Sequence, residues 1–208
     1  MKEISTELLD EVRERQGGTW THNPAFDKQG AVIVKGAIDP APFIQELPKH
    51  GFTRYNNGTI YDQSPKASQV SGSRETYCRP AYEALHKCDI RLIVEKTIGR
   101  KVYPTYHFDR FYLSNQTLAP HVDRQACEIS VSLLIDTTLT EPWPLYVLSP
   151  DMEASENNLD AGDILIYKGF ECLHWRDNIP RGNHRHHQAF FHYVLQDGNY
   201  AHFAFETL

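Results

Sequence analysis

After Gly99 the chain changes to short apolar runs separated by turns, and this pattern constrains the fold more than any other feature. The runs are rich in β-branched and aromatic residues, which favour strands over helices. Strands at such regular spacing are typical of an all-β sandwich or barrel. The predicted strands are Val102 to Leu113, Cys127 to Thr137, Trp143 to Leu148, Ile164 to Tyr167 and His186 to Leu195.

The first hundred residues carry mixed helix and strand signals. Apolar residues at helical spacing, with capping signals at the ends, predict helices over residues 4–16, from Asp39 to Leu47 and from Cys78 to Ile98. A short strand is predicted at Ala31 to Val34, and Asn57-Gly58 predicts a hairpin turn within Phe52 to Asp62. We expect this half to support the β structure that follows.

The segment from Gln63 to Thr76 is rich in Ser and Gly and has few apolar anchors. This composition predicts a loop. Two interpretations remain open, because such a loop can close over a pocket as a lid or simply lie exposed on the surface.

Length, charge and cysteine spacing limit the classes of protein. With 208 residues, we expect one domain over 1–208, in which 1–100 is support and possible lid and 101–208 is the core. The net charge of −6 argues against nucleic acid as a partner. Four cysteines without CxxC spacing predict free thiols. No stretch resembles a signal peptide or a spanning helix, so we expect a cytoplasmic protein without membrane contact, of unassigned oligomeric state.

His121-Val122-Asp123 and His174 form the most informative set of polar residues. Side chains two apart on a strand point the same way, so His121 and Asp123 can grip a metal together while His174 completes the set from a neighbouring strand. Two histidines and one carboxylate, with open positions beside them, form the facial triad of non-haem Fe(II) oxygenases.

A second pair of the same form, His107-Phe108-Asp109, competes for this role. It lies inside an aromatic run, where His107 is also typical of a hydrogen-bonded core histidine and Asp109, beside Arg110, of a strand charge pair. His121 instead follows Pro120 at a predicted strand edge. This context favours the pair at His121.

His174 taken alone is also typical of a surface histidine in a turn, because Trp175-Arg176-Asp177 follows it directly. The residues before it favour a functional role. Gly162-Asp163 predicts a turn into the strand Ile164 to Tyr167, and Lys168-Gly169 predicts a second turn before His174.

These features resemble the double-stranded β-helix of the Fe(II)/2-oxoglutarate-dependent dioxygenases, in particular their prolyl-hydroxylase-like branch. The resemblance covers roughly residues 102 to 196. It implies a mainly β fold with N-terminal helices (α+β), in which helices support a jelly-roll, cupin-like barrel. It also implies that His121, Asp123 and His174 are both the metal ligands and the catalytic centre.

The resemblance further implies residues for the co-substrate. A basic residue about ten positions after the second histidine receives the far carboxylate, and Arg185 lies eleven positions after His174. Arg181 and His187 are alternatives. Tyr112, nine positions before His121, is the candidate for a further co-substrate hydrogen bond, although it is equally typical of a core aromatic. The strand Ile129 to Leu134 lacks a tyrosine that relatives use there.

The chemistry implied by the resemblance is hydroxylation of an aliphatic C–H bond, coupled to conversion of 2-oxoglutarate to succinate and CO₂. The cofactors would be Fe(II), 2-oxoglutarate and O₂, with ascorbate as an optional addition. Asp123 occupies the position that halogenating relatives leave to chloride, so hydroxylation is favoured. The substrate implied is a prolyl or peptidyl residue, with a free amino acid or another small metabolite as the alternative.

Two other classes remain open. A cupin-like metal-binding protein without 2-oxoglutarate chemistry would fit the same clamp, and so would a binding module that has lost turnover. The stretch His184 to His187 suggests zinc, but it lacks cysteine partners and is more typical of a basic strand edge.

Overall fold

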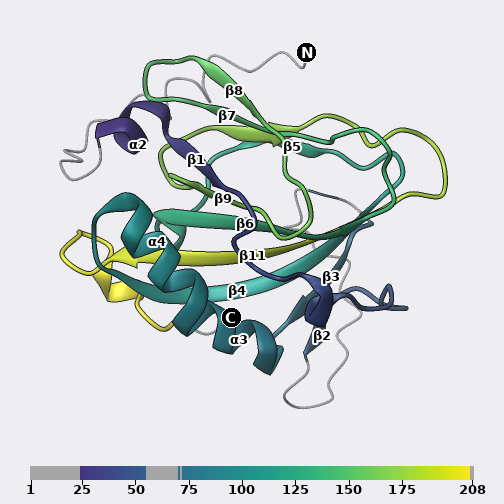
Figure 1. The fold of residues 1–208 in the computed structure, drawn as a ribbon, viewed down its shortest axis with the longest axis horizontal. Coiled ribbons are helices and arrows are strands. Elements are labelled where there is room, and N and C mark those ends of the chain that lie inside the picture. Colours follow the sequence, from purple (N-terminus) through teal and green to yellow (C-terminus); the bar gives the residue numbers. More distant parts are fainter. Residues whose placement is uncertain (1–23, 55–69, 71, 207–208) are drawn as a thin grey trace.

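The computed structural model describes residues 24–54, 70 and 72–206 (Figure 1). Two mainly antiparallel β-sheets lie face to face, and most of the helical residues pack against the outer side of the larger sheet. The predicted mainly β fold with helical support is therefore confirmed.

The large sheet has seven strands in the order β1-β9-β6-β11-β4-β3-β2 and the small sheet four in the order β5-β10-β7-β8. In chain order these are β1 (Ala31–Val34), β2 (Thr53–Arg54), β3 (Arg74–Tyr77), β4 (Val102–Leu113), β5 (Leu118–His121), β6 (Ile129–Thr137), β7 (Leu145–Leu148), β8 (Ala154–Asn157), β9 (Ile164–Tyr167), β10 (His174–Arg176) and β11 (Arg185–Leu195). The helices are α2 (Pro24–Gln29), α3 (Pro80–Leu85) and α4 (Arg91–Ile98), with a π-helical segment at His86–Ile90 and short 3₁₀ turns at Ala41–Phe43, Gln125–Cys127 and Ala201–Phe203.

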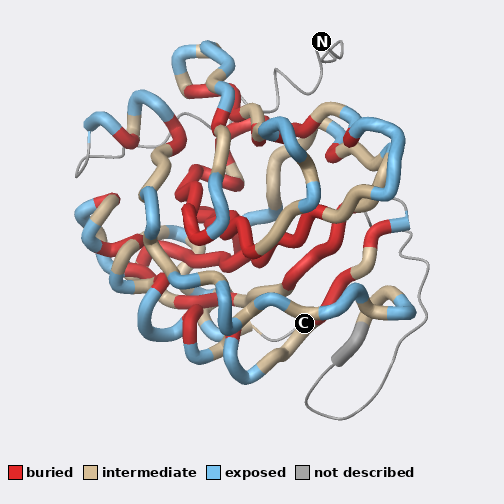
Figure 2. The backbone as a smooth tube through the Cα atoms, turned by 45° about the vertical axis from the view of Figure 1, so that its right-hand side comes forward, coloured by how far each residue is buried: buried red, intermediate tan, exposed pale blue. Residues whose placement is uncertain are grey.

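The two faces of β11 belong to two different cores. Phe191 and Tyr193 face outward and pack with Tyr82 of α3 and Val94 of α4. Phe190 faces the other way, into the core between the two sheets. Because successive side chains on a strand point to opposite faces, this alternation separates a structural layer under the helices from an inner layer between the sheets. Figure 2 shows the buried strands at the centre of the molecule.

All five strands predicted after Gly99 are present, and two of them begin later than predicted. A 3₁₀ turn occupies Gln125–Cys127, so β6 begins at Ile129, and β7 begins at Leu145. The short strands β5, β8 and β10 complete the small sheet.

The helix predicted from Cys78 to Ile98 is confirmed, although it begins at Pro80 and contains the π-helical segment. The prediction of a helix from Asp39 to Leu47 is wrong, because the helical structure in this segment is limited to a 3₁₀ turn at Ala41–Phe43. Pro40, Pro42 and Pro48 explain the difference. Proline lacks the N–H that a helix needs, and Pro48 disfavours helical geometry at the residue before it.

The loop predicted from Gln63 to Thr76 ends earlier than expected. Arg74–Tyr77 form β3, which pairs with β4 on one side and runs parallel to β2 on the other. Glu75 on this strand is 3% exposed. The helix predicted over residues 4–16, the Asn57-Gly58 turn and residues 63–69 of the loop lie outside the described residues. No described helix is long and apolar enough to span a membrane.

Candidate active site

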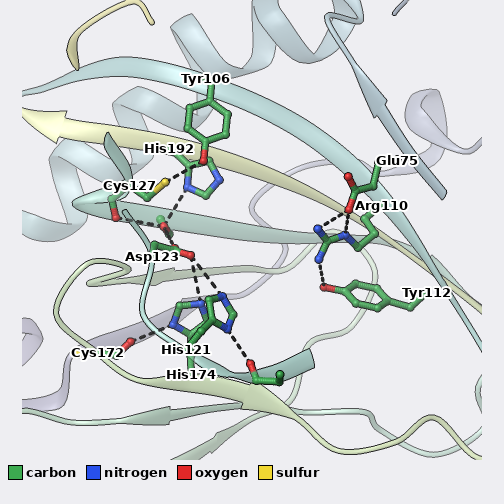
Figure 3. A network of polar contacts seen from close by, with 12 residues as sticks. Glu75, Tyr106, Arg110, Tyr112, His121, Asp123, Cys127, Cys172, His174 and His192 are labelled. Atoms are coloured by element: carbon green, nitrogen blue, oxygen red, sulfur yellow. Dashed lines mark hydrogen bonds and ion pairs between the residues drawn. The ribbon is translucent and has the colours of Figure 1, made fainter. Parts of the chain in front are cut away.

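The small sheet and the segment after β5 bring His121, Asp123 and His174 together, as the sequence predicts (Figure 3). His121 ends β5 and His174 begins β10, and the two residues are paired opposite each other in the ladder. The Nε2 atoms of His121 and His174 lie 3.5 Å and 3.6 Å from Oδ1 of Asp123. One ligand atom from each residue falls within 4.8 Å of the other two. This spacing suits a single metal ion.

Backbone carbonyl groups hold both imidazole rings. The Nδ1 atom of His121 lies 2.8 Å from the carbonyl oxygen of Ala119, and that of His174 lies 2.9 Å from the carbonyl oxygen of Cys172. Since a carbonyl only accepts, each Nδ1 carries the proton and donates it. Both Nε2 atoms face Asp123. A neutral ring with its proton on Nδ1 leaves Nε2 free to bind a metal.

Asp123 is held from both its backbone and its side chain. Its N–H donates to the carbonyl of Gly169 at 2.8 Å, and Ser130 Oγ donates to its Oδ2 at 2.8 Å. Ser130 Oγ also lies 3.0 Å from Nδ1 of His192. A Cβ atom at Gly169 would lie 2.2 Å from Ser130 Oγ and 2.5 Å from Asp123 Oδ2. Glycine is therefore needed at this position, because a side chain would clash with both partners of the hydrogen bond between Ser130 and Asp123.

The charge states match those of a metal-binding set. Burial acts to raise the pKa of Asp123, but His174 and His121 hold that pKa well below the usual value. Burial and the neighbouring His174 lower the pKa of His121, so its ring is neutral at physiological pH. Metal binding requires an ionised carboxylate and neutral imidazoles, and the surroundings of Asp123 and His121 favour these states.

The three residues line a cavity of about 350 Å³ between the sheets. Its lining includes Tyr112, Leu118 and Tyr167, which belong to the core between the sheets, and further aromatic side chains such as Tyr77 of β3 and Phe108 of β4. Tyr112, which the sequence suggests as a co-substrate residue, is thus on the cavity wall.

The structure does not bring Arg185 or its two alternatives to this cavity. Arg185 is partly exposed and forms an ion pair with Asp136. Arg181 is exposed. His187 is buried on the opposite face of β11, where it stacks on Phe111 with 3.8 Å between ring centroids. None of the three is among the residues that line the cavity.

The rival pair at His107 does not form a comparable centre. Both side chains belong to the outer face of β4. Asp109 bonds to Nε2 of His187 at 2.6 Å, and the His107 ring packs 5.5 Å from that of His86. Among the described residues, neither His107 nor Asp109 belongs to a cluster with metal-ligand spacing.

Arg176 is a buried cation that the motif reasoning misses. It is 1% exposed, its guanidinium donates to Gln188 Oε1 at 2.9 Å and to the carbonyl of Trp143, and it lies 4.6 Å over the Trp143 ring. Its Nε has no partner and no carboxylate of the described residues pairs with it. Burial lowers its pKa to about 10. Its place two residues after His174 on a strand is the signal that could have identified it.

Comparisons of the sequence find no matching family model and no matching curated protein. Comparison of the structure finds many solved relatives. A non-haem α-ketoglutarate-dependent epimerase from nogalamycin biosynthesis is 13% identical, with a TM-score of 0.59 over 91% of this chain and 83% of its own. The fold is the double-stranded β-helix of the 2-oxoglutarate oxygenases.

Two further oxygenase structures support this fold assignment. A prolyl-4-hydroxylase from Pseudomonas putida is 12% identical, with a TM-score of 0.54 over 87% of this chain and 97% of its own. The protein HygX from Streptomyces hygroscopicus, solved with nickel, 2-oxoglutarate and hygromycin B, is 11% identical, with a TM-score of 0.56 over 91% of this chain and 87% of its own. The predicted resemblance to 2-oxoglutarate oxygenases, including prolyl hydroxylases, is confirmed for the fold.

Proposed function

We propose that this protein is an Fe(II)- and 2-oxoglutarate-dependent oxygenase that hydroxylates an aliphatic C–H bond. The observation that carries this proposal is the convergence of His121, Asp123 and His174 in one cavity, with Nδ1 of each imidazole donating to a backbone carbonyl and Nε2 facing Asp123. Two neutral nitrogens and one carboxylate oxygen fit the donor set of a non-haem iron site. Related structures hold Fe³⁺ with α-ketoglutarate or nickel with 2-oxoglutarate.

When bound, iron and 2-oxoglutarate would supply the oxidising chemistry, with O₂ as the oxidant and succinate and CO₂ as by-products. The chain itself has the tasks of binding and positioning. His121 and His174 present Nε2, Asp123 presents a carboxylate oxygen, and Ser130 fixes the rotation of that carboxylate. The surrounding aromatic walls keep bulk water from the reacting atoms.

Arg176 is our candidate for the group that receives the far carboxylate of 2-oxoglutarate, in place of Arg185. A buried cation without an anionic partner costs several kcal/mol, and a dicarboxylate would remove that cost. Arg176 does not itself line the cavity, but Leu118, which is opposite Arg176 in the ladder, and Tyr112, whose ring contacts that of Trp143 beside Arg176, both do. A bound co-substrate would therefore approach Arg176 at these two residues.

Tyr112 is suited to assist Arg176. Its hydroxyl oxygen accepts a hydrogen bond from Arg110 Nη1 at 3.3 Å. Its own O–H is then available to donate to a carboxylate. This arrangement supports the co-substrate role that the resemblance implies for Tyr112.

The test is formation of succinate from 2-oxoglutarate by the purified protein. We expect succinate only when Fe(II), O₂ and 2-oxoglutarate are all present, and none from the His174→Ala variant. Metal binding without any succinate would contradict the proposal and favour a cupin-like protein without 2-oxoglutarate chemistry.

The substrate is proposed only as a class. Similar structures act on, or hold, both peptides and small molecules: one is a prolyl hydroxylase with a peptide fragment and another contains hygromycin B. Mass spectrometry of proline-containing peptides after incubation tests the prolyl alternative. A gain of one oxygen atom would support it, and its absence would leave the small-molecule alternative.

A further inference from the structure

One wall of the cavity is built largely from four aromatic rings stacked in series. Phe52 and Tyr77 lie 5.2 Å apart between ring centroids, Tyr77 and Phe108 5.5 Å, and Phe108 and Phe190 4.9 Å. The angles between these ring planes are 13°, 29° and 30°. All four residues line the cavity. The wall is thus a near-parallel aromatic stack, which favours stacked or edge-to-face contacts with another flat ring.

The charged groups on this wall already have protein partners. Arg110 forms an ion pair with Glu75, and both side chains are buried. Arg124 forms two hydrogen bonds with Glu206, at 3.0 Å and 2.7 Å. Apart from the metal-binding set, no lining residue among those described offers an uncompensated charge. A substrate with a free carboxylate or ammonium group would therefore lose its hydration without gaining a partner.

One uncompensated hydrogen-bond acceptor does lie on the wall near the metal-binding set. Ser130 Oγ donates its proton to Asp123, so it must accept one from Nδ1 of His192. The Nε2 atom of His192 is then an acceptor, and it is buried without a partner among the described residues. His192 lines the cavity and is 4% exposed. A buried acceptor of this kind calls for a donor from a ligand.

We propose that the cavity binds an uncharged small molecule with a flat aromatic ring system, whose O–H or N–H group donates to Nε2 of His192. This inference rests on the proposed oxygenase function, since it names the substrate class of the same site. His192 lies beside the metal-binding set, because one of its ring nitrogens is within 4.8 Å of an Asp123 carboxylate oxygen, so a ligand bound to His192 would lie near that set.

The same observations argue against the other substrate classes. A free amino acid carries both an ammonium and a carboxylate group, and the wall has no free partner for either. A peptide needs donors and acceptors along its backbone. On this wall such groups are engaged within the protein, and Glu75 alone accepts from Ser73, Tyr77 and Arg110.

The test is calorimetric binding to the protein loaded with Ni(II) and 2-oxoglutarate. The probes are 2-naphthol, its methyl ether 2-methoxynaphthalene, N-acetyl-L-proline methylamide and L-phenylalanine. We expect 2-naphthol to bind most tightly and the ether roughly five- to tenfold more weakly, because the ether lacks the donor for one hydrogen bond. We expect the two amino-acid probes to bind more weakly than the ether.

Three variants assign the binding to the wall. His192→Phe keeps a ring but removes the acceptor, so it should abolish the difference between 2-naphthol and its ether. Phe108→Leu should weaken both naphthalene probes. Tyr146→Ala is the matched control, since it removes a ring that stacks on Trp175 outside the cavity, at 5.4 Å, and should change neither affinity.

The outcomes separate this inference from the proposed function. Tighter binding of the proline or phenylalanine probe would overturn the inference, and so would equal affinity for 2-naphthol and its ether in the unmodified protein. Failure of 2-naphthol to bind a protein that does bind Ni(II) and 2-oxoglutarate would overturn the substrate class alone. Failure of 2-oxoglutarate itself to bind counts against the proposed function.

Discussion

The two His-x-Asp pairs of this chain have the same residue types and opposite environments. His121 and Asp123 lie at and just beyond the end of β5, on the cavity between the sheets. His107 and Asp109 lie in the middle of β4 and face the helical layer, where Asp109 bonds to His187. The comparison teaches that the surroundings separate two identical motifs. Asp123 faces the cavity beside the Nε2 atoms of His121 and His174, whereas Asp109 bonds to His187 away from the cavity.

The largest expected difference between the pairs is in metal affinity. His121→Ala should weaken Ni(II) binding more than a hundredfold, because changes outside the ligand set alone typically cost ~10–100-fold. His107→Ala should leave the affinity unchanged. Isothermal titration calorimetry of both variants measures this directly. Weaker binding by His107→Ala alone would reverse the assignment.

The two candidate arginines extend the comparison to the co-substrate. Arg176→Met should weaken 2-oxoglutarate binding to the Ni(II)-loaded protein on the order of a hundredfold, since it removes a buried charge from a charge pair. The same variant should unfold at a higher temperature without ligand, because it also removes an uncompensated buried cation. Arg185→Met serves as the control and should bind 2-oxoglutarate normally. The opposite pattern would restore Arg185 as the anchor.

A smaller effect is expected from the support of Asp123. Ser130→Ala removes the hydrogen bond to Oδ2 and should weaken Ni(II) binding about tenfold. Ser132→Ala is matched to it, because Ser132 is also buried on β6 but its hydroxyl has no partner among the described residues. If both variants bind Ni(II) as tightly as the unmodified protein, Ser130 does not position the carboxylate.

The smallest effects concern the pH dependence of stability without metal, and here the two carboxylates should act in opposite directions. Burial raises the pKa of Asp109, so its contribution to stability falls as pH rises above the usual carboxyl value. The pKa of Asp123 is well below that value, so its contribution is present above it and is lost as pH falls.

Urea unfolding from about pH 3 to about pH 6 tests this difference. Relative to the unmodified protein, Asp109→Asn should gain stability as pH rises and Asp123→Asn should lose it, by at most about 1.4 kcal/mol per pH unit each. Slopes of the same sign for both variants would contradict the environments described for the two pairs.

Much of the fold and the metal-binding set follows from local patterns in the sequence. The strands after Gly99 and the helix up to Ile98 have clear apolar periodicity. The sequence places His121 at a predicted strand edge, and in the structure it ends β5, a short strand that the sequence does not predict. Local patterns could not predict the direction in which the Arg185 side chain points. Whether its side chain faces the cavity depends on the register of β11 against β6, which contains an irregularity between His187 and Gln188.

Contacts between residues on strands distant in the sequence could not be predicted from local patterns either. Ser130 and His192 meet only because β6 pairs with β11. Glu75 reaches Arg110 because part of the predicted loop is the strand β3. Arg176 differs from these residues, because its spacing of two from His174 on a strand could have identified it, although the sequence analysis did not use this signal.

The most direct test of the central claim is anaerobic addition of Fe(II) and 2-oxoglutarate to the purified protein. The account predicts the weak visible charge-transfer band of an iron–2-oxoglutarate chelate in the unmodified protein and in His107→Ala, and no band in His121→Ala. A band that survives His121→Ala, or no band in the unmodified protein, would contradict it.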